Sequence, residues 1–511
     1  MFPGAKAQSD FVDVLSYDVE ISLNDSSNLI KVKESVRLRF KEDCDNFNLD
    51  LESSYSENKG MTVNSEVGVK EEGNKVSFNH QNHRLNIQPI NAKKGDERTY
   101  YFEYSGIPKD GLIIGKNKFE ERTFFGDNWP NRAHHWIACV DHPSDKAKIN
   151  FTVIAPKHYD CVATGTLQKT ETLGKGYKKH TFQSKYDLPT KVMVIGLANF
   201  AVNPLETDLG FPTSVWSYQK DSAQGYSLMK IAPGICQYFI GRIGDYPYEK
   251  LANVQSTTRY GGMENAGNIF YDEMEVKGKH SMEALIAHEI AHQWFGNSAS
   301  EADWEHVWLS EGFATYFTDL YWEKQHGVDR FQERMKHERD RVIKFARRSP
   351  AHLVDEHYTD INQLLNPNSY QKGAWVLHML RREISDLAFW SGIRSYYQKY
   401  QYSNATSSEF FDVMEEVSRK ELDWFENQWL YRKGHPVLSF DIQEENQEFY
   451  FEVTQEQPGE PFIFPLEISL KDGEIQKLRV EEKKQRFKLP SNVKLGDIEI
   501  DPNVNLLWEK F

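Results

Sequence analysis

Alternating apolar and polar residues dominate the first two hundred positions of the chain. Leu15–Leu23 and Val32–Phe40 both show this alternation, and a cluster of polar turn residues separates them. Because successive side chains of a strand point to opposite faces, a period of two predicts sheets with one buried face. Shorter runs with the same character follow at 76–78, 100–104 and 149–154. We therefore expect an N-terminal β-sheet domain over residues 1–205.

The pattern changes to a helical period over residues 206–433. The clearest helical segments are Ser281–Phe295, Val307–Gln325 and Gly373–Tyr400. A further helix start is marked by Thr406-Ser407-Ser408-Glu409, a capping box whose hydroxyl and carboxylate groups satisfy free backbone N–H groups. This part of the chain is predicted to be a mostly helical domain of the kind that carries catalysis.

After Gly434-His435-Pro436 the period of two returns. The alternating apolar positions are Val437, Phe449, Phe451, Val453, Leu466, Ile468 and Leu470. Asp472-Gly473 is a typical hairpin turn. A small β domain over residues 434–511 therefore closes the chain, and the predicted fold class is multidomain α+β.

Length and composition agree with a multidomain globular protein. The chain has 511 residues, of which 39% are hydrophobic and 13% aromatic, so it can bury several cores. Its formal net charge of −15 would repel nucleic acid and anionic membranes. No segment reaches the apolar length of a membrane span. We expect neither a nucleic-acid partner nor a membrane span, and we interpret the chain as a monomer.

The cysteines and the first residues bear on the compartment. Cys44, Cys139, Cys161 and Cys236 form no metal-binding spacing, so we expect them to be unpaired and buried. The start, Met1–Gln8, has no apolar signal core, which favours a cytoplasmic location. The alternative is an exported protein whose presequence has been removed, because Ala5-Lys6-Ala7 resembles a signal-cleavage site.

The most informative stretch is His288-Glu289-Ile290-Ala291-His292, within a predicted helix. Residues four apart lie on one face of a helix, so His288 and His292 can converge on one metal ion. Two imidazoles suit zinc, and Glu289 would be placed to take a proton from water as general base. The same motif also arises by chance, so it does not decide the function alone.

Zinc needs a third protein ligand, and Glu311 is the candidate. Two histidines and one carboxylate leave the fourth position for water. The alternative is a carboxylate on a helix surface. The apolar neighbours Trp308, Leu309 and Phe313 instead suggest a buried helix, where an unpaired charge would be costly.

A glycine pair lies upstream of the histidines, in Thr257–Gly267. Gly261 and Gly262 follow a polar strand and would let a peptide backbone approach closely. On composition alone, a simple turn explains the same pair.

These motifs together resemble the aminopeptidase N and leukotriene hydrolase family of zinc aminopeptidases. The resemblance depends on Gly261-Gly262-Met263-Glu264-Asn265, on His288-Glu289-x-x-His292 and on Glu311. Further landmarks extend it over nearly the whole chain: Cys139-Val140-Asp141-His142-Pro143, Lys146-Ala147, Tyr370-Gln371-Lys372-Gly373-Ala374 and Asp501-Pro502-Asn503. The resemblance implies a saddle-like N-terminal β domain, a thermolysin-like catalytic domain and a small C-terminal domain like a β-sandwich.

The resemblance also implies roles for individual residues. Glu264 would hold the free α-amino group of the substrate, and Gly261 and Gly262 would pair with the substrate backbone. Met263 would help to shape the pocket for the N-terminal side chain, and Tyr370 would stabilise the oxyanion. The implied activity is removal of single N-terminal residues from peptides with a free N-terminus, with one Zn²⁺ ion per chain.

The chain departs from the family pattern at two places. The family's glutamine that helps to bind the substrate amine is missing from Phe125–Trp129, and Asp127, with Asn128 beside it, stands at that position. We hypothesise that Asp127 is the second amine ligand. The family's asparagine before Glu311 is replaced by Ser310, and Thr315 or Asp319 is expected to orient the ligand instead.

The resemblance leaves alternatives. Large relatives continue into a long helical domain, so this chain is expected to be a short form with a more open site. The β ending argues against the leukotriene hydrolase subgroup. A peptide-binding protein without catalysis, or a zinc endopeptidase, would keep several of the same residues. Intact ligands, base and tyrosine favour an enzyme, and Glu264 favours an exopeptidase.

Overall fold

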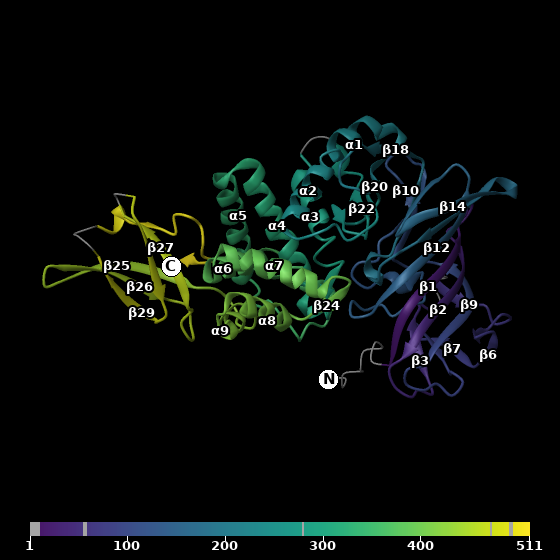
Figure 1. The fold of residues 1–511 in the computed structure, drawn as a ribbon, viewed down its shortest axis with the longest axis horizontal. Helices are drawn as coiled ribbons and strands as arrows, with labels where there is room; N and C mark the ends of the chain where they lie inside the picture. Colours follow the sequence, from purple (N-terminus) through teal and green to yellow (C-terminus); the bar gives the residue numbers. More distant parts are fainter. Residues whose placement is uncertain (1–10, 55–58, 278–280, 471–472, 490–493) are drawn as a thin grey trace. The chain divides into compact units, whose positions relative to one another are not determined.

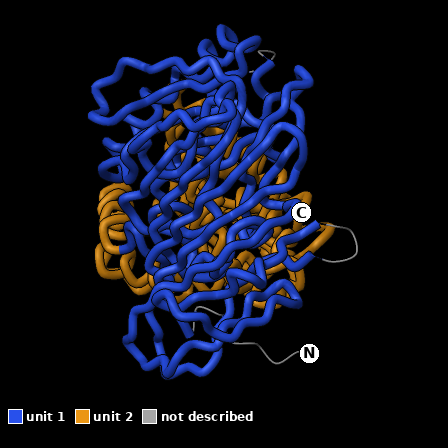
Figure 2. Tube along the Cα trace, turned by 90° about the vertical axis from the view of Figure 1, so that its right-hand side faces the viewer, with its two compact units in different colours: residues 1–303, 400–405 blue, residues 304–399, 406–511 orange. Residues whose placement is uncertain are grey.

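The computed structural model describes residues 11–54, 59–277, 281–470, 473–489 and 494–511 (Figure 1). Met1–Gln8 and Asp472 lie outside these residues. The chain divides into two compact units, coloured separately in Figure 2. The first unit comprises 1–303 with 400–405, and the second comprises 304–399 with 406–511. The domain boundaries at 205 and 433 stay a prediction.

A large sheet forms the N-terminal part of the first unit (Figure 1). Its centre is β1 (Val12–Ser22), which pairs antiparallel with β2 (Ile30–Phe40) and parallel with β12 (Lys146–Pro156). Buried and exposed side chains alternate along β2, as the period of two predicts. The sheet continues through β9 (Glu97–Ile107), β5 (Val69–Glu71) and β6 (Asn74–Val76) on one side, and β15 (Tyr177–Gln183) and β14 (Thr166–Leu173) on the other.

Two smaller sheets complete this β region. One has the order β10 (Leu112–Lys116), β11 (Arg122–Gly126), β17 (Ile195–Ala198), β13 (Asp160–Ala163). The other has the order β3 (Phe47–Asp50), β8 (Arg84–Ile87), β7 (Phe78–Gln81). β4 (Gly60–Val63) also pairs with β9, and β16 (Leu188–Pro189) also pairs with β12.

A five-stranded mixed sheet with adjacent helices forms the rest of the first unit. Its order is β18 (Phe200–Leu205), β19 (Thr213–Tyr218), β20 (Leu251–Ser256), β22 (Asn268–Asp272), β21 (Gly262–Met263). The helices are α1 (Ser222–Met229), α2 (Ala232–Arg242) and α3 (Glu283–Ala291). β23 (Ala299–Glu301) pairs with β24 (Ser403–Ala405), which brings 400–405 into this unit.

Helices dominate the first part of the second unit. They are α4 (Trp308–His326), α5 (Val328–Ala346), α6 (Gly373–Ile384), α7 (Asp386–Tyr400), α8 (Ser407–Ser418) and α9 (Asp423–Leu430). The predicted capping box is present, since the Thr406 side chain accepts from the Glu409 backbone and Glu409 accepts from the Thr406 backbone.

Two helix predictions need correction. The predicted helix Gly373–Tyr400 is two helices, because Ser385 takes a φ of 90° and interrupts the helical backbone between α6 and α7. The predicted helix Ser281–Phe295 ends at Ala291, where the backbone bonds tighten to i→i−3 spacing before Gly296 turns away with a φ of 106°. Periodicity alone does not register either event.

The C-terminal strands form two sheets. One has the order β29 (Lys484–Lys488), β26 (Glu448–Gln455), β25 (Val437–Glu445), β31 (Glu509–Lys510). The other has the order β28 (Ile475–Val480), β27 (Phe464–Ser469), β30 (Glu499–Ile500). β27 and β28 pair antiparallel. A β N-terminal region, a mostly helical region and C-terminal strands confirm the predicted fold class.

Two smaller expectations can be checked directly. All four cysteines are free and buried, as predicted. Among the described residues, no helix combines the length and apolar character that crossing a membrane requires.

A buried acid lies at the centre of the large sheet. The Oε2 atom of Glu34, on β2, accepts hydrogen bonds from the Tyr104 hydroxyl at 2.6 Å and from the Ala138 amide at 3.1 Å. Burial raises the pKa of Glu34 to about 8, because desolvation disfavours the carboxylate and these two donors only partly offset it.

This raised pKa predicts a pH dependence of stability. An unfolded glutamate loses its proton near about pH 4.3, whereas Glu34 in the folded chain keeps its proton up to its raised pKa. Between these two pH values the folded chain therefore binds one proton more than the unfolded chain. The free energy of unfolding should therefore fall as pH rises, by at most about 1.4 kcal/mol per pH unit from this group. Urea unfolding of Glu34→Gln from pH 5 to 8 should show a shallower fall than wild type. Glu66→Gln, at an exposed glutamate, should retain the wild-type slope.

Candidate active site

The two predicted metal-binding histidines face each other at the C-terminal end of α3. Their Nε2 atoms lie 3.1 Å apart. His292 follows the last residue of α3 but keeps helical backbone angles, and its amide donates to the His288 carbonyl at 3.2 Å. The i, i+4 relation therefore survives the early end of the helix.

The tautomer of His292 that its hydrogen bond implies suits a metal ligand. Its Nδ1 lies 3.1 Å from the carbonyl oxygen of Phe295. A carbonyl oxygen only accepts, so Nδ1 bears the proton and the lone pair stays on Nε2. The nitrogen that faces His288 is thus the one able to bind a cation.

Glu289 lies against the glycine-rich segment of the same unit. Its side chain is buried, and it contacts Gly262 so closely that a Cβ added there would lie 2.3 Å from Oε1 of Glu289. A Cβ added at Gly261 would meet nothing nearer than 3.8 Å. Only the second glycine is therefore required by the position of the predicted base.

Gly262 and Met263 form β21, which pairs antiparallel with β22 at the edge of the mixed sheet. An edge strand presents backbone N–H and C=O groups to which an extended peptide can add. The segment after β21 is tied to the turn that follows α3. Gln293 and Asn297 each donate a side-chain N–H to the carbonyl oxygen of Glu264, both at 2.7 Å.

Glu264 combines a fixed backbone with an available carboxylate. Its exposed fraction is 5%, and its Oε1 atom has no hydrogen-bond partner among the described residues. A buried carboxylate oxygen without a donor is costly unless a ligand supplies one. The arrangement suits a cationic ligand group.

Asp127 lies just after β11 and is fully buried. Its Oδ1 is 2.8 Å from a guanidinium nitrogen of Arg132, and Nε of Arg259 lies 3.6 Å from Oδ2. Burial raises the pKa of Asp127, and the two guanidinium groups oppose this rise. A substrate amine at Asp127 would have to share the carboxylate with these cations.

The side chain of Asn128 instead makes hydrogen bonds within the fold. Its amide donates to the carbonyl oxygens of Thr190 at 3.0 Å and Met193 at 2.6 Å, and its oxygen accepts from Trp136 Nε1 at 2.8 Å. With these bonds made, Asn128 is the weaker of the two candidates for amine binding.

In the second unit, Glu311 lies in the first turn of α4 and is buried. The next residue, Gly312, packs directly on α6. A Cβ at Gly312 would lie 2.8 Å from Cα of Gly373 and 3.1 Å from the carbonyl oxygen of Ser369. This glycine contact brings the backbone beside Glu311 against the segment that contains Tyr370.

Tyr370 belongs to a single π-helical turn, Asn368–Lys372, that leads into α6. The amide of Lys372 donates to the Pro367 carbonyl at 2.9 Å, which is the wide i→i−5 bond of such a turn. Tyr370 itself is half-buried. Burial lowers the pKa of the nearby Lys372 to about 8.

The residues expected to orient Glu311 have other described contacts. The Thr315 hydroxyl donates to the backbone carbonyl of Glu311 at 2.7 Å. Asp319 accepts from Arg334 Nε at 2.6 Å, and burial raises its pKa while Arg334 opposes the rise. Thr315 thus bonds to the backbone of its own helix, α4, and Asp319 pairs with an arginine of the neighbouring helix, α5.

Sequence reasoning missed Gln293 and Asn297 as site residues. The signal in the sequence was that two amide side chains follow the histidine motif closely. Their burial, and their shared acceptor, the Glu264 carbonyl, are features of the fold.

Comparison with known families identifies two matching regions. The peptidase family M1 domain matches residues 236–429, and the peptidase M1 N-terminal domain matches residues 14–192. Together these matches span more than half of the chain.

Individual relatives share only about a quarter of their residues with this chain over the matched regions. The chain is 26% identical to a probable aminopeptidase 2 of Sulfurisphaera tokodaii over 464 residues, covering 85% of this chain and 57% of the relative. It is 26% identical to glutamyl aminopeptidase of Sus scrofa over 337 residues, covering 62% of this chain and 35% of the relative. The chain thus spans roughly a third to somewhat over half of the length of these relatives.

The fold also resembles a solved structure. An M1 zinc metallopeptidase from Deinococcus radiodurans, an E323A mutant bound to a Tyr-Ser-Ala substrate, superposes with a TM-score of 0.71 at 20% identity. The match covers 82% of this chain and 94% of that one. Both family models and this shared fold agree with the motifs on α3, and the chain therefore belongs to peptidase family M1.

Proposed function

We propose that the protein is a zinc-dependent aminopeptidase that removes single N-terminal residues from peptides. The observation that carries the proposal is the arrangement in the first unit. Facing Nε2 atoms of His288 and His292 lie on the helix of Glu289, and the same segment holds the backbone of Glu264, whose buried carboxylate oxygen lacks a partner. The named relatives are aminopeptidases, which supports the same activity.

The metal ligands in this proposal are His288, His292 and Glu311, which can offer one ligand atom each. Two imidazoles and one carboxylate are a common donor set for catalytic zinc. The separation of 3.1 Å between the histidine nitrogens suits two ligands of one ion at about 2.1 Å. The solved relative is described as a zinc metallopeptidase, which supports zinc as the metal.

Glu289 acts as the general base. Zinc, when bound, supplies a Lewis acid that polarises the peptide carbonyl and lowers the pKa of water towards neutrality. Glu289 takes the proton from the attacking water and passes it to the leaving amine. Gly262 leaves room for this carboxylate beside the strand that would meet the substrate backbone.

Glu264 makes the enzyme an exopeptidase. Its free carboxylate oxygen pairs with the α-ammonium group of the substrate, in a charge-assisted hydrogen bond. A substrate that extended further on its amino side would place an uncharged peptide group beside Glu264 and would leave the carboxylate unpaired. Gly261 and Gly262 pair with the substrate backbone along the edge strand β21, and Met263 borders the pocket for the first side chain.

Tyr370 stabilises the oxyanion that forms as water adds to the carbonyl, by donating a hydrogen bond from its hydroxyl group. Its placement on a π-helical turn agrees with this role, because such turns are frequent at functional sites. The partners of the protein in this proposal are peptides with a free N-terminus.

The proposal is tested with aminoacyl fluorogenic substrates and their N-acetylated counterparts. We expect hydrolysis of the free-amine substrates only, its loss with a chelator and its recovery with Zn²⁺. Glu289→Gln should lower kcat by about 10²- to 10⁴-fold, as loss of a general base does. Glu283→Gln, on the same helix, serves as the matched control and should retain activity. Equal cleavage of acetylated substrates would instead indicate an endopeptidase, and binding without hydrolysis a non-catalytic protein.

The glycine pair provides a second test. Gly262→Ala would place its Cβ 2.3 Å from Oε1 of Glu289, and the flexible carboxylate must move aside. We expect kcat to fall on the order of 10²-fold, the loss typical of a misplaced catalytic group, with thermal stability nearly unchanged. Gly261→Ala, where no atom lies within 3.4 Å of the new Cβ, should lose much less. Equal losses in the two variants would contradict the role given to Gly262.

Asp127 is proposed as the second ligand of the substrate amine. Asp127→Asn should raise KM for free-amine substrates more than it lowers kcat, because the variant keeps the shape but loses the charge. Asp110→Asn is the control, since Asp110 also pairs with Arg259. If Asp127→Asn lowers only the unfolding temperature and leaves KM unchanged, Asp127 serves Arg132 and not the substrate.

A further inference from the structure

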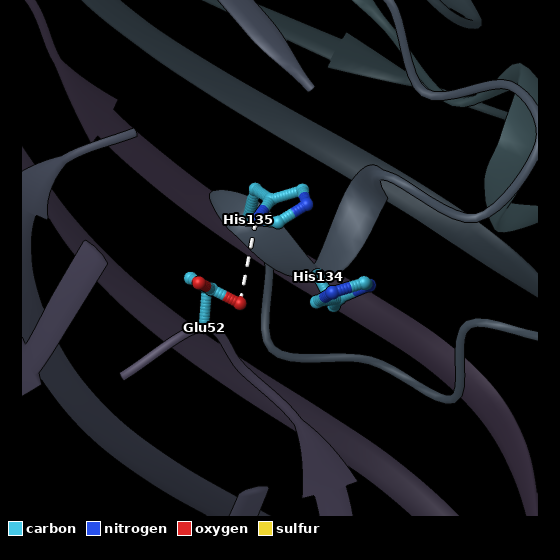
Figure 3. Close-up of side chains that lie close together, drawn as sticks. All are labelled: Glu52, His134 and His135. Atoms are coloured by element: carbon cyan, nitrogen blue, oxygen red, sulfur yellow. Dashed lines mark ion pairs between the residues drawn. The ribbon is translucent and has the colours of Figure 1, made fainter. Parts of the chain in front are cut away.

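A second group of side chains with metal-ligand chemistry lies in the N-terminal β region, apart from the histidines of α3. Glu52, His134 and His135 each offer one ligand atom, and these atoms all lie within 4.8 Å of one another (Figure 3). We propose that this group binds a divalent transition-metal ion of the class that prefers imidazole, such as Zn²⁺. The proposal does not depend on the aminopeptidase function.

The distances around Glu52 suit such an ion. Nδ1 of His135 lies 3.6 Å from Oε2 of Glu52, the pair joined by the dashed line in Figure 3. Two ligands of a tetrahedral zinc ion at about 2.1 Å are separated by roughly 3.4 Å. His83 approaches the same oxygen, with its Nδ1 at 2.9 Å, as an ion pair beside the three proposed ligands.

Backbone hydrogen bonds hold the three segments of this group together. The Glu52 amide donates to the His134 carbonyl at 2.9 Å, and the Leu51 amide donates to the His83 carbonyl at 3.1 Å. Asp50 and Cys139 exchange backbone bonds of 2.7 and 3.0 Å beside them. The ligands are therefore preorganised, although they come from distant parts of the sequence.

Outer contacts orient two of the ligands. Lys109 Nζ lies 2.8 Å from Oε1 of Glu52, which leaves Oε2 facing the histidines. Asp141 Oδ2 lies 2.7 Å from Nδ1 of His134, the carboxylate–histidine contact that commonly supports a metal-binding ring. Such outer contacts fix a ring before the metal arrives.

A network of hydrogen bonds without metal is the competing explanation. It accounts for Lys109 and Asp141 but leaves Nδ1 of His135, a buried atom, without a hydrogen-bond partner among the described residues. A metal ion would satisfy that nitrogen. The side chain of His83 is 43% exposed, so an ion can reach the group from solvent.

The test uses the full chain, stripped of metal and dialysed to equilibrium against Zn²⁺, with bound zinc measured by mass spectrometry. Wild type should bind two equivalents if the site on α3 is also filled. His134→Ala/His135→Ala should bind one fewer than wild type while it keeps aminopeptidase activity, which also reports that it is folded. His158→Ala removes an exposed histidine that pairs with Asp25, and it should bind as wild type does.

A second variant tests zinc binding by Glu52, His134 and His135 without changing any of these three residues. His288→Ala/His292→Ala leaves Glu52, His134 and His135 intact and should still bind one zinc ion. If this variant binds none, or if His134→Ala/His135→Ala binds as much zinc as wild type, the proposed site is wrong. If the aminopeptidase proposal fails instead, the one equivalent at Glu52 remains.

Discussion

Two side-chain amides hold the candidate active site of the first unit together. Gln293 and Asn297 both donate to the carbonyl oxygen of Glu264, and the amide of Gly267 donates back to Gln293 Oε1 at 3.0 Å. These bonds fix the glycine-rich segment against the histidine helix. They help to fix the position of Glu264 relative to His288 and His292, and in the proposed function this position sets how much of a peptide fits between the acid and the metal.

Glycine contacts set the closest approaches in both units. Gly262 admits the carboxylate of Glu289, and Gly312 admits the backbone of Gly373. In each case a methyl group would overlap an atom of the neighbouring segment. At both positions the glycine lacks a side chain, and this lets two segments of the chain lie in direct contact. In both cases one of these segments contains a residue predicted to act in catalysis or metal binding.

Buried charges are handled differently around the site. Asp127 and Asp319 are each paired with an arginine, which limits the cost of removing a carboxylate from water. Oε1 of Glu264 has no such partner among the described residues, and the carboxylate of Glu34 receives only neutral donors. An arginine within the chain therefore compensates the charge of Asp127 and of Asp319, whereas the proposed partner of Glu264 is the substrate amine.

The sequence by itself determined the features that depend on neighbours along the chain. The period of two predicted the strands, and the capping box and the i, i+4 spacing on α3 predicted local geometry, because hydrogen bonds within one segment decide them. Tertiary structure decided the rest. The break at Ser385 and the early end of α3, the edge position of β21, the structural use of Asn128 and the grouping of Glu52 with His134 and His135 all depend on segments far apart in the chain. Periodicity does not specify which strands pair, so it could not bring those residues together.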